Sequence, residues 1–160
     1  MKSEKSVKTN VMRILDQKKI AYQSYCYADT QAVSGREVAQ VLNQNPAQVF
    51  KTLVTISGTG EHFVFVIPVG KELDLKKAAK AVKQKSIQML KSRELLPLTG
   101  YVHGGCSPIG MKKFFRTIID SSAKDQKSVI FSAGKIGYQV ELTLADLQKV
   151  ITFSLEDIII

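Results

Sequence analysis

The spacing of apolar residues changes several times along the chain, and each spacing predicts a different kind of element. Apolar residues three and four positions apart predict amphipathic helices at residues 9–18 and 73–82. Runs of β-branched and aromatic residues, some alternating with polar ones, predict strands at residues 22–27, 49–56, 62–67, 117–120, 129–132, 138–142 and 151–153. This alternation is typical of an α/β protein. Because the chain has no repeat and no linker, we expect one domain over residues 1–160.

Polar residues at the ends of apolar stretches predict where further helices begin. Ser34 and Glu37 have the spacing of a capping box, and the helix that follows should bury Val38, Val41 and Leu42. The signal is physical, because these side chains can satisfy the free amides of the first helical turn.

Three more signals of this kind occur later in the chain. An asparagine, a proline and a glutamine at residues 45–48 predict a helix of only one or two turns, since a strand follows directly. Residues 93–96 predict a short helix or turn that Pro97 ends. Thr143 is placed to cap a last helix.

The clearest pair of strands forms a predicted hairpin at the centre of the chain. Residues 50–56 and 62–67 flank a short loop that contains two glycines. Apolar runs this dense predict strands buried on both faces. Lys51 interrupts the first run, so this lysine should be paired, point to an edge or serve a ligand.

Composition and charge limit the class of protein. The chain has 160 residues, 44% of them hydrophobic, which is enough for a core of its own. The first ten residues lack the apolar stretch of a signal peptide, no apolar run is long enough to span a membrane, and the two cysteines make no disulfide framework. We therefore expect a cytoplasmic protein with free thiols.

Basic residues are in excess and are unevenly distributed. Lys and Arg number 23 against 14 acidic residues, a net charge of +9, and residues 71–93 alone hold eight basic residues against two acids. A one-sided basic face favours a polyanionic partner, most simply RNA or DNA. A lysine-rich helix whose charges are only solvated would show the same composition.

The segment YVHGGCSPIGMK at residues 101–112 is the strongest local signal for a binding site. Two adjacent glycines allow a sharp turn or a close approach to a ligand, and the proline stiffens the loop. We expect free amides at Gly105, Cys106 and Ser107 that could bind a carbonyl oxygen, a carboxylate or a phosphate. An ordinary tight turn uses the same residue types.

Few other residues carry recognisable chemistry. His62 and His103 are too few and too isolated for a zinc site, and no phosphate-binding or dinucleotide-binding motif is present. Cys106 is better explained as a packed thiol than as a nucleophile, because no histidine or acid stands in a recognisable activating motif. A second glycine motif, at residues 132–137, follows a strand and could line the same cleft.

Five segments in this order resemble the YbaK/EbsC family of bacterial prolyl-tRNA editing proteins. They read VFKTL at residues 49–53, FVIPV at 65–69, ELDLKK at 72–77, GGCSPIGMKK at 104–113 and SAGK at 132–135. The resemblance implies a compact α/β domain with a mixed, barrel-like β-sheet surrounded by helices. It also implies hydrolysis of the ester between a wrong amino acid, most often cysteine, and tRNA(Pro), with no cofactor and no metal.

The resemblance assigns roles to particular residues. It implies an essential Lys51 and a pocket lined by Tyr27, Thr52, Ser132 and the loop Gly104, Gly105, Cys106, Ser107 and Pro108. No protein nucleophile is implied, because the thiol of the substrate cysteine attacks its own ester. The partners would be mischarged tRNA(Pro) and, in a ternary complex, prolyl-tRNA synthetase. The basic excess at residues 71–93 suggests that Lys76, Lys80 and Lys83 hold the tRNA.

Two positions depart from the family pattern and leave the amino-acid specificity open. Gly70 stands where many relatives have asparagine, and Gln139 where many have aspartate. Removal of alanine or serine is therefore an alternative reaction. A non-catalytic module that binds tRNA or the synthetase is a second alternative, which the presence of Lys51 disfavours. A regulator of cell-surface binding substances is suggested only by the name of one branch of the family.

Overall fold

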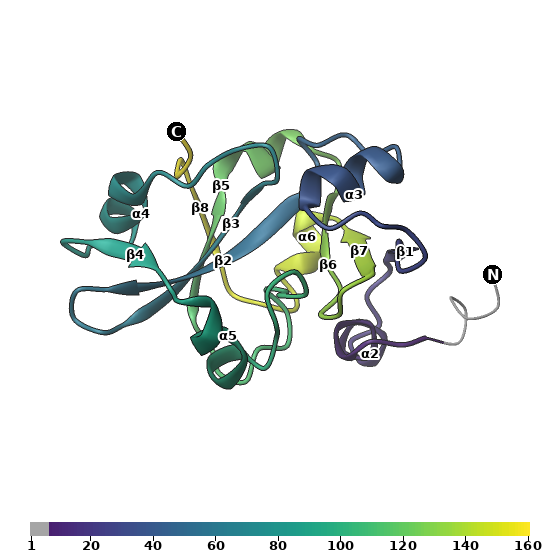
Figure 1. The fold of residues 1–160 in the computed structure, drawn as a ribbon, viewed down its shortest axis with the longest axis horizontal. Coiled ribbons are helices and arrows are strands. Elements are labelled where there is room, and N and C mark those ends of the chain that lie inside the picture. Colours follow the sequence, from purple (N-terminus) through teal and green to yellow (C-terminus); the bar gives the residue numbers. More distant parts are fainter. Residues whose placement is uncertain (1–6) are drawn as a thin grey trace.

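The computed structural model describes residues 7–160, which form two β-sheets with helices around them (Figure 1). The helices are α2 (Asn10–Gln17), α3 (Gly35–Val41), α4 (Leu75–Ala81), α5 (Ser92–Thr99), the 3₁₀ helix η1 (Ser121–Asp125) and α6 (Leu144–Leu147). The strands are β1 (Gln23–Cys26), β2 (Phe50–Ser57), β3 (His62–Pro68), β4 (Ile87–Met89), β5 (Arg116–Asp120), β6 (Val129–Ser132), β7 (Tyr138–Leu142) and β8 (Ser154–Glu156). The α/β class expected from the sequence is confirmed.

The larger sheet has the strand order β4-β2-β3-β5-β8, and the smaller has the order β1-β7-β6. In the larger sheet β3 pairs with β5 and β5 with β8 in parallel, while the remaining pairs are antiparallel. A parallel bridge between Val49 and Ile130 joins the two sheets. The sheets do not close into a continuous barrel, so the barrel-like sheet is a small correction to the expectation.

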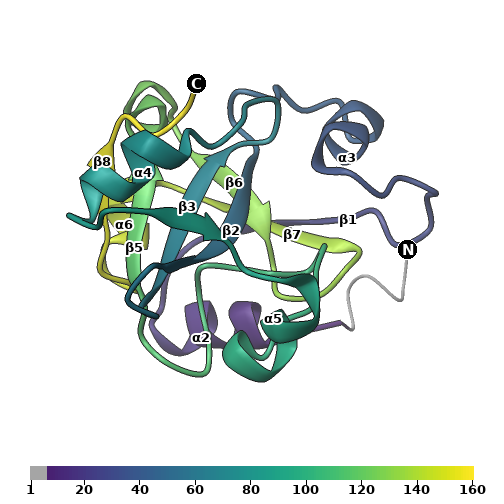
Figure 2. The same ribbon diagram turned by 60° about the vertical axis from the view of Figure 1, so that its left-hand side comes forward.

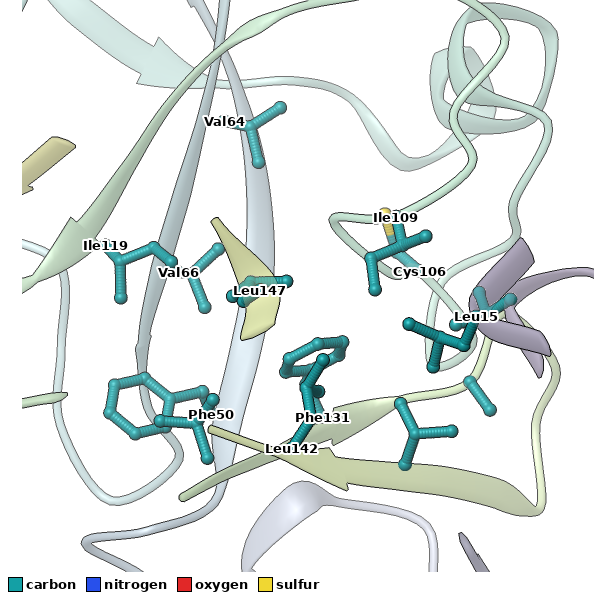
Figure 3. Close-up of a cluster of buried hydrophobic side chains, with 14 of the residues drawn as sticks. Leu15, Phe50, Val64, Val66, Cys106, Ile109, Ile119, Phe131, Leu142 and Leu147 are labelled. Carbon is teal, nitrogen blue, oxygen red and sulfur yellow. The ribbon is translucent and has the colours of Figure 1, made fainter. Parts of the chain in front are cut away.

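The central hairpin is buried on both faces, as its apolar pattern predicts. Val64 and Val66 of β3 face the core between the two sheets, which Figure 3 shows together with Phe50, Phe131 and Leu147. The alternate residues of β3 face the other way, onto α4. Because both faces of β3 are covered, this strand lies at the centre of the domain, with one hydrophobic cluster on each side.

Several helix starts use the polar caps that the sequence predicts. The hydroxyl of Thr9 accepts a hydrogen bond from the amide of Met12 at 3.2 Å, and Ser34 and Glu37 form a complete capping box. One detail is wrong: Val41 is 53% exposed. The helix α3 has only seven residues and packs through Val38 and its neighbour in sequence, so its last residue lies outside the contact.

The expected helix at residues 45–48 is a single turn. The side-chain oxygen of Asn45 accepts from the amide of Ala47 at 3.0 Å, and the amide of Gln48 bonds to the carbonyl of Asn45 at 2.9 Å. The chain then becomes extended at once, because Val49 bridges to Ile130. Pairing between the sheets therefore ends the helix before it can propagate.

Pro97 does not end the helix that precedes it, contrary to expectation. The helix α5 runs to Thr99, with the hydroxyl of Thr99 donating to the carbonyl of Leu95 at 2.8 Å and the amide of Gly100 donating to Leu96 at 2.9 Å. These two bonds hold the last helical turn together, although Pro97 itself has no amide hydrogen to donate. Gly100 then ends the helix in the left-handed conformation, with φ of +89°.

Two strands differ from the predicted pattern. The short strand β4 has no clear apolar signal in the sequence and forms by pairing with Thr55, Ile56 and Ser57 of β2. The last strand, β8, begins at Ser154 rather than residue 151. Its start is delayed because the amide of Ile151 still bonds to Leu147 at 3.0 Å, in the turn that follows α6.

No helix within residues 7–160 is long and apolar enough to cross a membrane.

The C-terminal part of the chain is tied to the larger sheet by one buried carboxylate. Asp120 is 2% exposed; its two oxygens accept from the amides of Ser122 and Ile158, both at 3.1 Å. A carboxylate that accepts two amide bonds inside the protein satisfies donors that would otherwise be buried unpaired.

We predict that Asp120→Ala lowers the free energy of unfolding by about 1–3 kcal/mol, because two amides lose their acceptor. Urea unfolding followed by circular dichroism measures the change. Asp125→Ala is the matched control, since Asp125 is exposed on the same 3₁₀ helix and should change the free energy by less than about 0.5 kcal/mol. Equal effects of the two substitutions would contradict the assignment.

Candidate functional site

A cavity of about 650 Å³ opens beside the first half of β2. Its walls come from β2, from α3 and the residues just before it, from β4 and α5, from the glycine loop at residues 101–110, and from β6 and β7. In Figures 1 and 2, α3 lies near the start of β2, and α5 lies well apart from α3. The cavity thus collects residues that are far apart in sequence.

The cavity exists because one edge of β2 is only partly paired. On that side β4 pairs with residues 55–57 of β2, and the Val49–Ile130 bridge lies before β2 begins. Within the described chain no strand pairs with residues 50–53 on this side. The carbonyl of Val54 points to this side, where it accepts from Leu90 at 3.0 Å. Because backbone groups alternate along a strand, the amide and carbonyl of Thr52 face the same side, toward the cavity.

Six of the nine predicted pocket residues line this cavity. They are Tyr27, Lys51, Thr52, Gly104, Cys106 and Ser132. Three others lie behind the wall: Gly105 and Ser107 are buried, and Pro108 borders a separate narrow apolar space against Phe50 and Val66. The predicted tRNA-binding residues Lys76, Lys80 and Lys83 are exposed on α4 and just after its end.

Lys51 is half-buried in β2, where it stands opposite Ile67 of β3. The ion pairs formed within residues 7–160 involve other lysines, and no carboxylate of these residues lies within 4.0 Å of the Lys51 ammonium. A half-buried ammonium without a carboxylate is costly unless it serves another anion or dipole. The structure therefore leaves the charge of Lys51 available to a ligand in the cavity.

The neighbouring residue supplies a second unpaired group. The hydroxyl oxygen of Thr52 is buried and has no hydrogen-bond partner within the described chain. A buried hydroxyl of this kind is usually satisfied, so a cavity next to it suggests a ligand or water partner. On the far wall, the hydroxyl of Ser132 accepts from the amide of Gly134 at 3.1 Å and keeps its proton available to donate.

The glycine loop is held in shape by its own hydrogen bonds. The hydroxyl of Tyr101 donates to the carbonyl of Ile109 at 2.6 Å, and the side chain of Ser107 accepts from the amide of Ile109 at 3.3 Å. Gly110 has φ of +81°, and a Cβ there would lie 2.6 Å from the Tyr101 hydroxyl. Only glycine fits at this position, so the loop depends on it.

Two of the three predicted amides are free. The amide of Gly105 is not, because it donates to the carbonyl of Val102 at 3.0 Å in a tight turn. The amides of Cys106 and Ser107 make no hydrogen bond of standard geometry with residues 7–160. Buried amides are nearly always paired, so these two amides are candidate donors to an oxygen ligand.

The second glycine motif was expected to line the cleft; only its Ser132 does so, and the rest of it packs against the glycine loop. A Cβ on Gly105 would lie 3.1 Å from the backbone nitrogen of Ile136, so the two loops touch through the bare face of Gly105. The amide of Ala133 bonds to Tyr138 at 3.0 Å and fixes the turn that holds Ile136. The contact positions the free amides relative to Ser132 across the cavity.

Sequence reasoning missed a polar pair in the wall. The side-chain oxygen of Gln139 accepts from Gln44 at 2.8 Å, while the side-chain oxygen of Gln44 is buried without a partner. Arg36 and Glu72 also line the cavity and bring charges of both signs to its mouth. Only the departure of Gln139 from the family pattern pointed to this region. The contact with Gln44 depends on how the smaller sheet meets α3.

Cys106 is unsuited to act as a nucleophile. Its side chain is 8% exposed, and burial raises the pKa of its thiol to about 12. The thiolate is the reactive form, so almost none is present near neutral pH. Cys106 thus contributes its backbone amide and its packing against the core (Figure 3).

The arrangement suits binding and polarisation of a carbonyl group. Lys51 provides a positive charge, the loop provides two free amides, and Thr52 and Ser132 provide hydroxyl groups. No group of three or more metal-ligating side chains occurs in residues 7–160. Donors aimed at one oxygen stabilise negative charge as it develops there.

Comparison with known families defines the class of this domain. The model of the aminoacyl-tRNA editing domain matches residues 29–150, a span that includes α3, β2 and the glycine loop. The chain is therefore an aminoacyl-tRNA editing domain. A protein of Enterococcus faecalis named Cys-tRNA(Pro)/Cys-tRNA(Cys) deacylase EbsC is 44% identical over 142 residues, which cover 88% of this chain and 87% of that protein. The chain belongs to the YbaK/EbsC family, which confirms the resemblance seen in its motifs.

Solved structures share the same fold. A protein described as a trans-editing enzyme for prolyl-tRNA synthetase superimposes with a TM-score of 0.80 at 20% identity, over 96% of this chain and 99% of the other. The hypothetical protein APE2540 superimposes with a TM-score of 0.82 at 18% identity, over 94% and 99%. The likeness shows that the arrangement of sheets and helices is that of the editing fold.

We predict that Cys106 is inert in the folded protein. In a Cys26→Ser variant, Cys106 is the remaining cysteine, and a disulfide reagent at pH 8 should titrate no thiol on the scale of minutes. In denaturant the same variant should react with one equivalent of the reagent, because its single thiol becomes exposed. Cys106→Ser titrated in parallel should react at Cys26, which is only partly buried. Rapid reaction of Cys106 without denaturant would contradict its burial.

Proposed function

We propose that this protein hydrolyses the ester between a wrong amino acid and tRNA(Pro), with cysteine as the preferred amino acid. The observation that carries the proposal is the Lys51 ammonium, unpaired within residues 7–160, in a cavity that is also lined by Cys106, whose amide is free. The free amide of Ser107 follows it in the same loop. The family and the name of the E. faecalis relative support the reaction class. The reaction would take place in the cytoplasm, where tRNA is charged.

In this proposal the amides of Cys106 and Ser107 bind the ester carbonyl. The thiol sulfur of the bound cysteine forms a bond to its own carbonyl carbon, and the ribose oxygen leaves with the thiol proton. Water then opens the resulting thiolactone and yields free cysteine. The protein accelerates the first step by holding thiol and carbonyl in attacking geometry and by stabilising the oxyanion.

Lys51 acts as an electrostatic group in this scheme. Its ammonium extends from the strand that borders the cavity and pairs with the ribose, the terminal phosphate or the developing oxyanion. Thr52 and Ser132 supply hydrogen bonds that hold the aminoacyl group, and Tyr27, which is 7% exposed, closes the wall behind it. Gly104 lets the chain turn at the mouth of the cavity, with φ of +90°.

The amino-acid specificity depends on groups that differ from the family pattern. Gln139 offers a neutral side-chain amide in place of the carboxylate found in many relatives, and Gly70, which follows the lining residue Val69, has no side chain. A smaller amino acid such as alanine or serine is therefore the second candidate. Alanine has no nucleophile of its own, so its removal would require attack by water.

The tRNA body would lie on the basic face of α4. Lys76, Lys80 and Lys83 are exposed and make no ion pair within the described chain, so their charges are available to phosphates. The neighbouring Lys77 pairs with Asp157 at 3.0 Å and is excluded from this set. Prolyl-tRNA synthetase could join in a ternary complex, because it releases the mischarged tRNA.

We predict that Lys51→Ala lowers single-turnover deacylation of Cys-tRNA(Pro) by about 10²-fold or more, the loss typical of one oxyanion donor. The melting temperature should stay unchanged or rise, because a half-buried charge is removed. Lys51→Arg should restore little, since a planar fork cannot replace a compact ammonium.

The matched control is Lys124→Ala, which removes an exposed lysine and should retain near-normal turnover. Unfolding of Lys51→Ala, or its normal turnover, would assign Lys51 a structural role. Substrates that carry alanine or serine on the same tRNA decide the specificity. No release of cysteine above the buffer control would refute the proposed reaction.

We also predict that replacing Lys76, Lys80 and Lys83 together with Glu weakens tRNA binding and flattens its salt dependence. Each phosphate contact contributes about −0.7 to −0.9 to the log–log slope of affinity against salt concentration. Fluorescence anisotropy at several salt concentrations measures the slope, and a melting curve checks the fold. The same reversal at the exposed Arg13, Lys18 and Lys19 serves as control and should leave the slope unchanged. A slope equal to that of the wild type in the α4 variant would remove α4 from the tRNA-binding face.

A further inference from the structure

Phe114 is an exposed aromatic residue with no role in the core. It exposes 73% of its surface, and within residues 7–160 every other phenylalanine and tyrosine is buried or half-buried. The next residue, Phe115, faces inward and meets the ring of His62 edge-on, with ring centroids 6.1 Å apart. The chain thus anchors itself through one phenylalanine and presents the other to solvent.

The surroundings of Phe114 are strongly basic. Lys112, Lys113 and Arg116 are all exposed within two residues of it. The sequence holds no acidic residue from position 95 to position 119, so no nearby carboxylate in this segment neutralises these charges. An exposed aromatic face among unneutralised cations fits single-stranded nucleic acid, which offers both flat bases and phosphates.

Hydrogen bonds fix this segment between two helices. The backbone amide of Lys112 donates to Thr99 at 3.0 Å, and its ammonium donates to the carbonyl of Pro97 at 3.3 Å, both in α5. On the other side, the guanidinium of Arg116 donates to the carbonyl of Ala81 at 3.4 Å, at the end of α4. The segment therefore connects α5 with the basic face of α4.

The helix α5 leads from the cavity to this segment. Ser92 and Leu95, in its first half, line the cavity, whereas its last residue bonds to Lys112. Eight helical residues span about 12 Å. The unpaired 3′ end of a tRNA has about four nucleotides, which at about 3.4 Å per stacked nucleotide span about 14 Å. The distances match if the terminal ribose enters the cavity and the first unpaired base lies beyond α5.

We propose that α5 and residues 111–116 hold the single-stranded 3′ end of the tRNA, and that Phe114 is the stacking platform for an unpaired base where this end joins the acceptor stem. This inference rests on the proposed function, which places the aminoacyl ester in the cavity. Arg93 and Leu96 extend the same surface along α5, since both are exposed there. Lys112 and Lys113 pair with phosphates, and the surface continues through Arg116 to Lys80 and Lys83.

A single tryptophan tests the contact directly. The chain contains no tryptophan, so Phe114→Trp introduces the only one. Its fluorescence should be quenched by uncharged tRNA(Pro), because a stacked base quenches indole, and should respond far less to the same tRNA with its last four nucleotides removed. Val41→Trp, at another exposed apolar position on α3, is the matched control and should show no quenching with either RNA.

Affinity measurements provide the second arm. Phe114→Ala should weaken binding of full-length tRNA(Pro) by about tenfold, the order of a lost base–aromatic stack, while Phe114→Tyr should bind normally. Lys113→Ala should reduce the salt slope by about one contact. Because Phe114 is exposed, the melting temperatures should not change.

Each other outcome overturns the inference in a distinct way. Equal quenching by intact and trimmed tRNA would remove the 3′ end from this surface. Quenching by prolyl-tRNA synthetase and not by tRNA would make the surface a protein-docking site. Both measurements report binding and not turnover. If Phe114→Ala binds tRNA(Pro) normally and the wild-type protein deacylates Cys-tRNA(Pro), this inference alone is refuted. Normal quenching without deacylation would refute only the proposed reaction.

Discussion

The partly paired edge of β2 is the constraint on which the site depends. Strand pairing with β4 stops at Thr55, and the bridge at Val49 attaches the smaller sheet on the other side of the gap. A closed barrel would have covered this edge and left no room for a ligand. The gap instead exposes backbone groups of Thr52 and the side chain of Lys51 to a cavity. Elsewhere the strand is held rigidly by β3, so these groups need little ordering when a ligand binds.

Rigidity around the cavity comes from interactions that do not themselves touch a ligand. Tyr101 holds the glycine loop through the carbonyl of Ile109, and the bare face of Gly105 lets Ile136 pack against the loop. Preorganised donors stabilise developing charge because they need not reorient during the reaction. Burial of Cys106 keeps its thiol neutral, so the side chain contributes packing and no nucleophile.

In the proposed function, several elements share the recognition of a long substrate. The cavity is large enough for an aminoacyl ester but far too small for a tRNA, so most contacts must lie outside it. The helices α4 and α5 flank the segment that carries Phe114, and Lys112 and Arg116 bind it to both. In this arrangement phosphate contacts would supply affinity, and stacking would set the position of the 3′ end.

The sequence by itself determined the local elements and the main chemical groups. Apolar periodicity and polar caps were enough to predict the central hairpin and the start of α3, and the resemblance carried by short motifs pointed to Lys51 and the glycine loop. Tertiary structure decided the rest. The strand β4 forms only because β2 offers it an edge, and the turn at residues 45–48 stops early because Val49 pairs with Ile130. Likewise, Gln139 meets Gln44 across 95 positions. Such contacts depend on how distant segments pack, which local propensity does not encode.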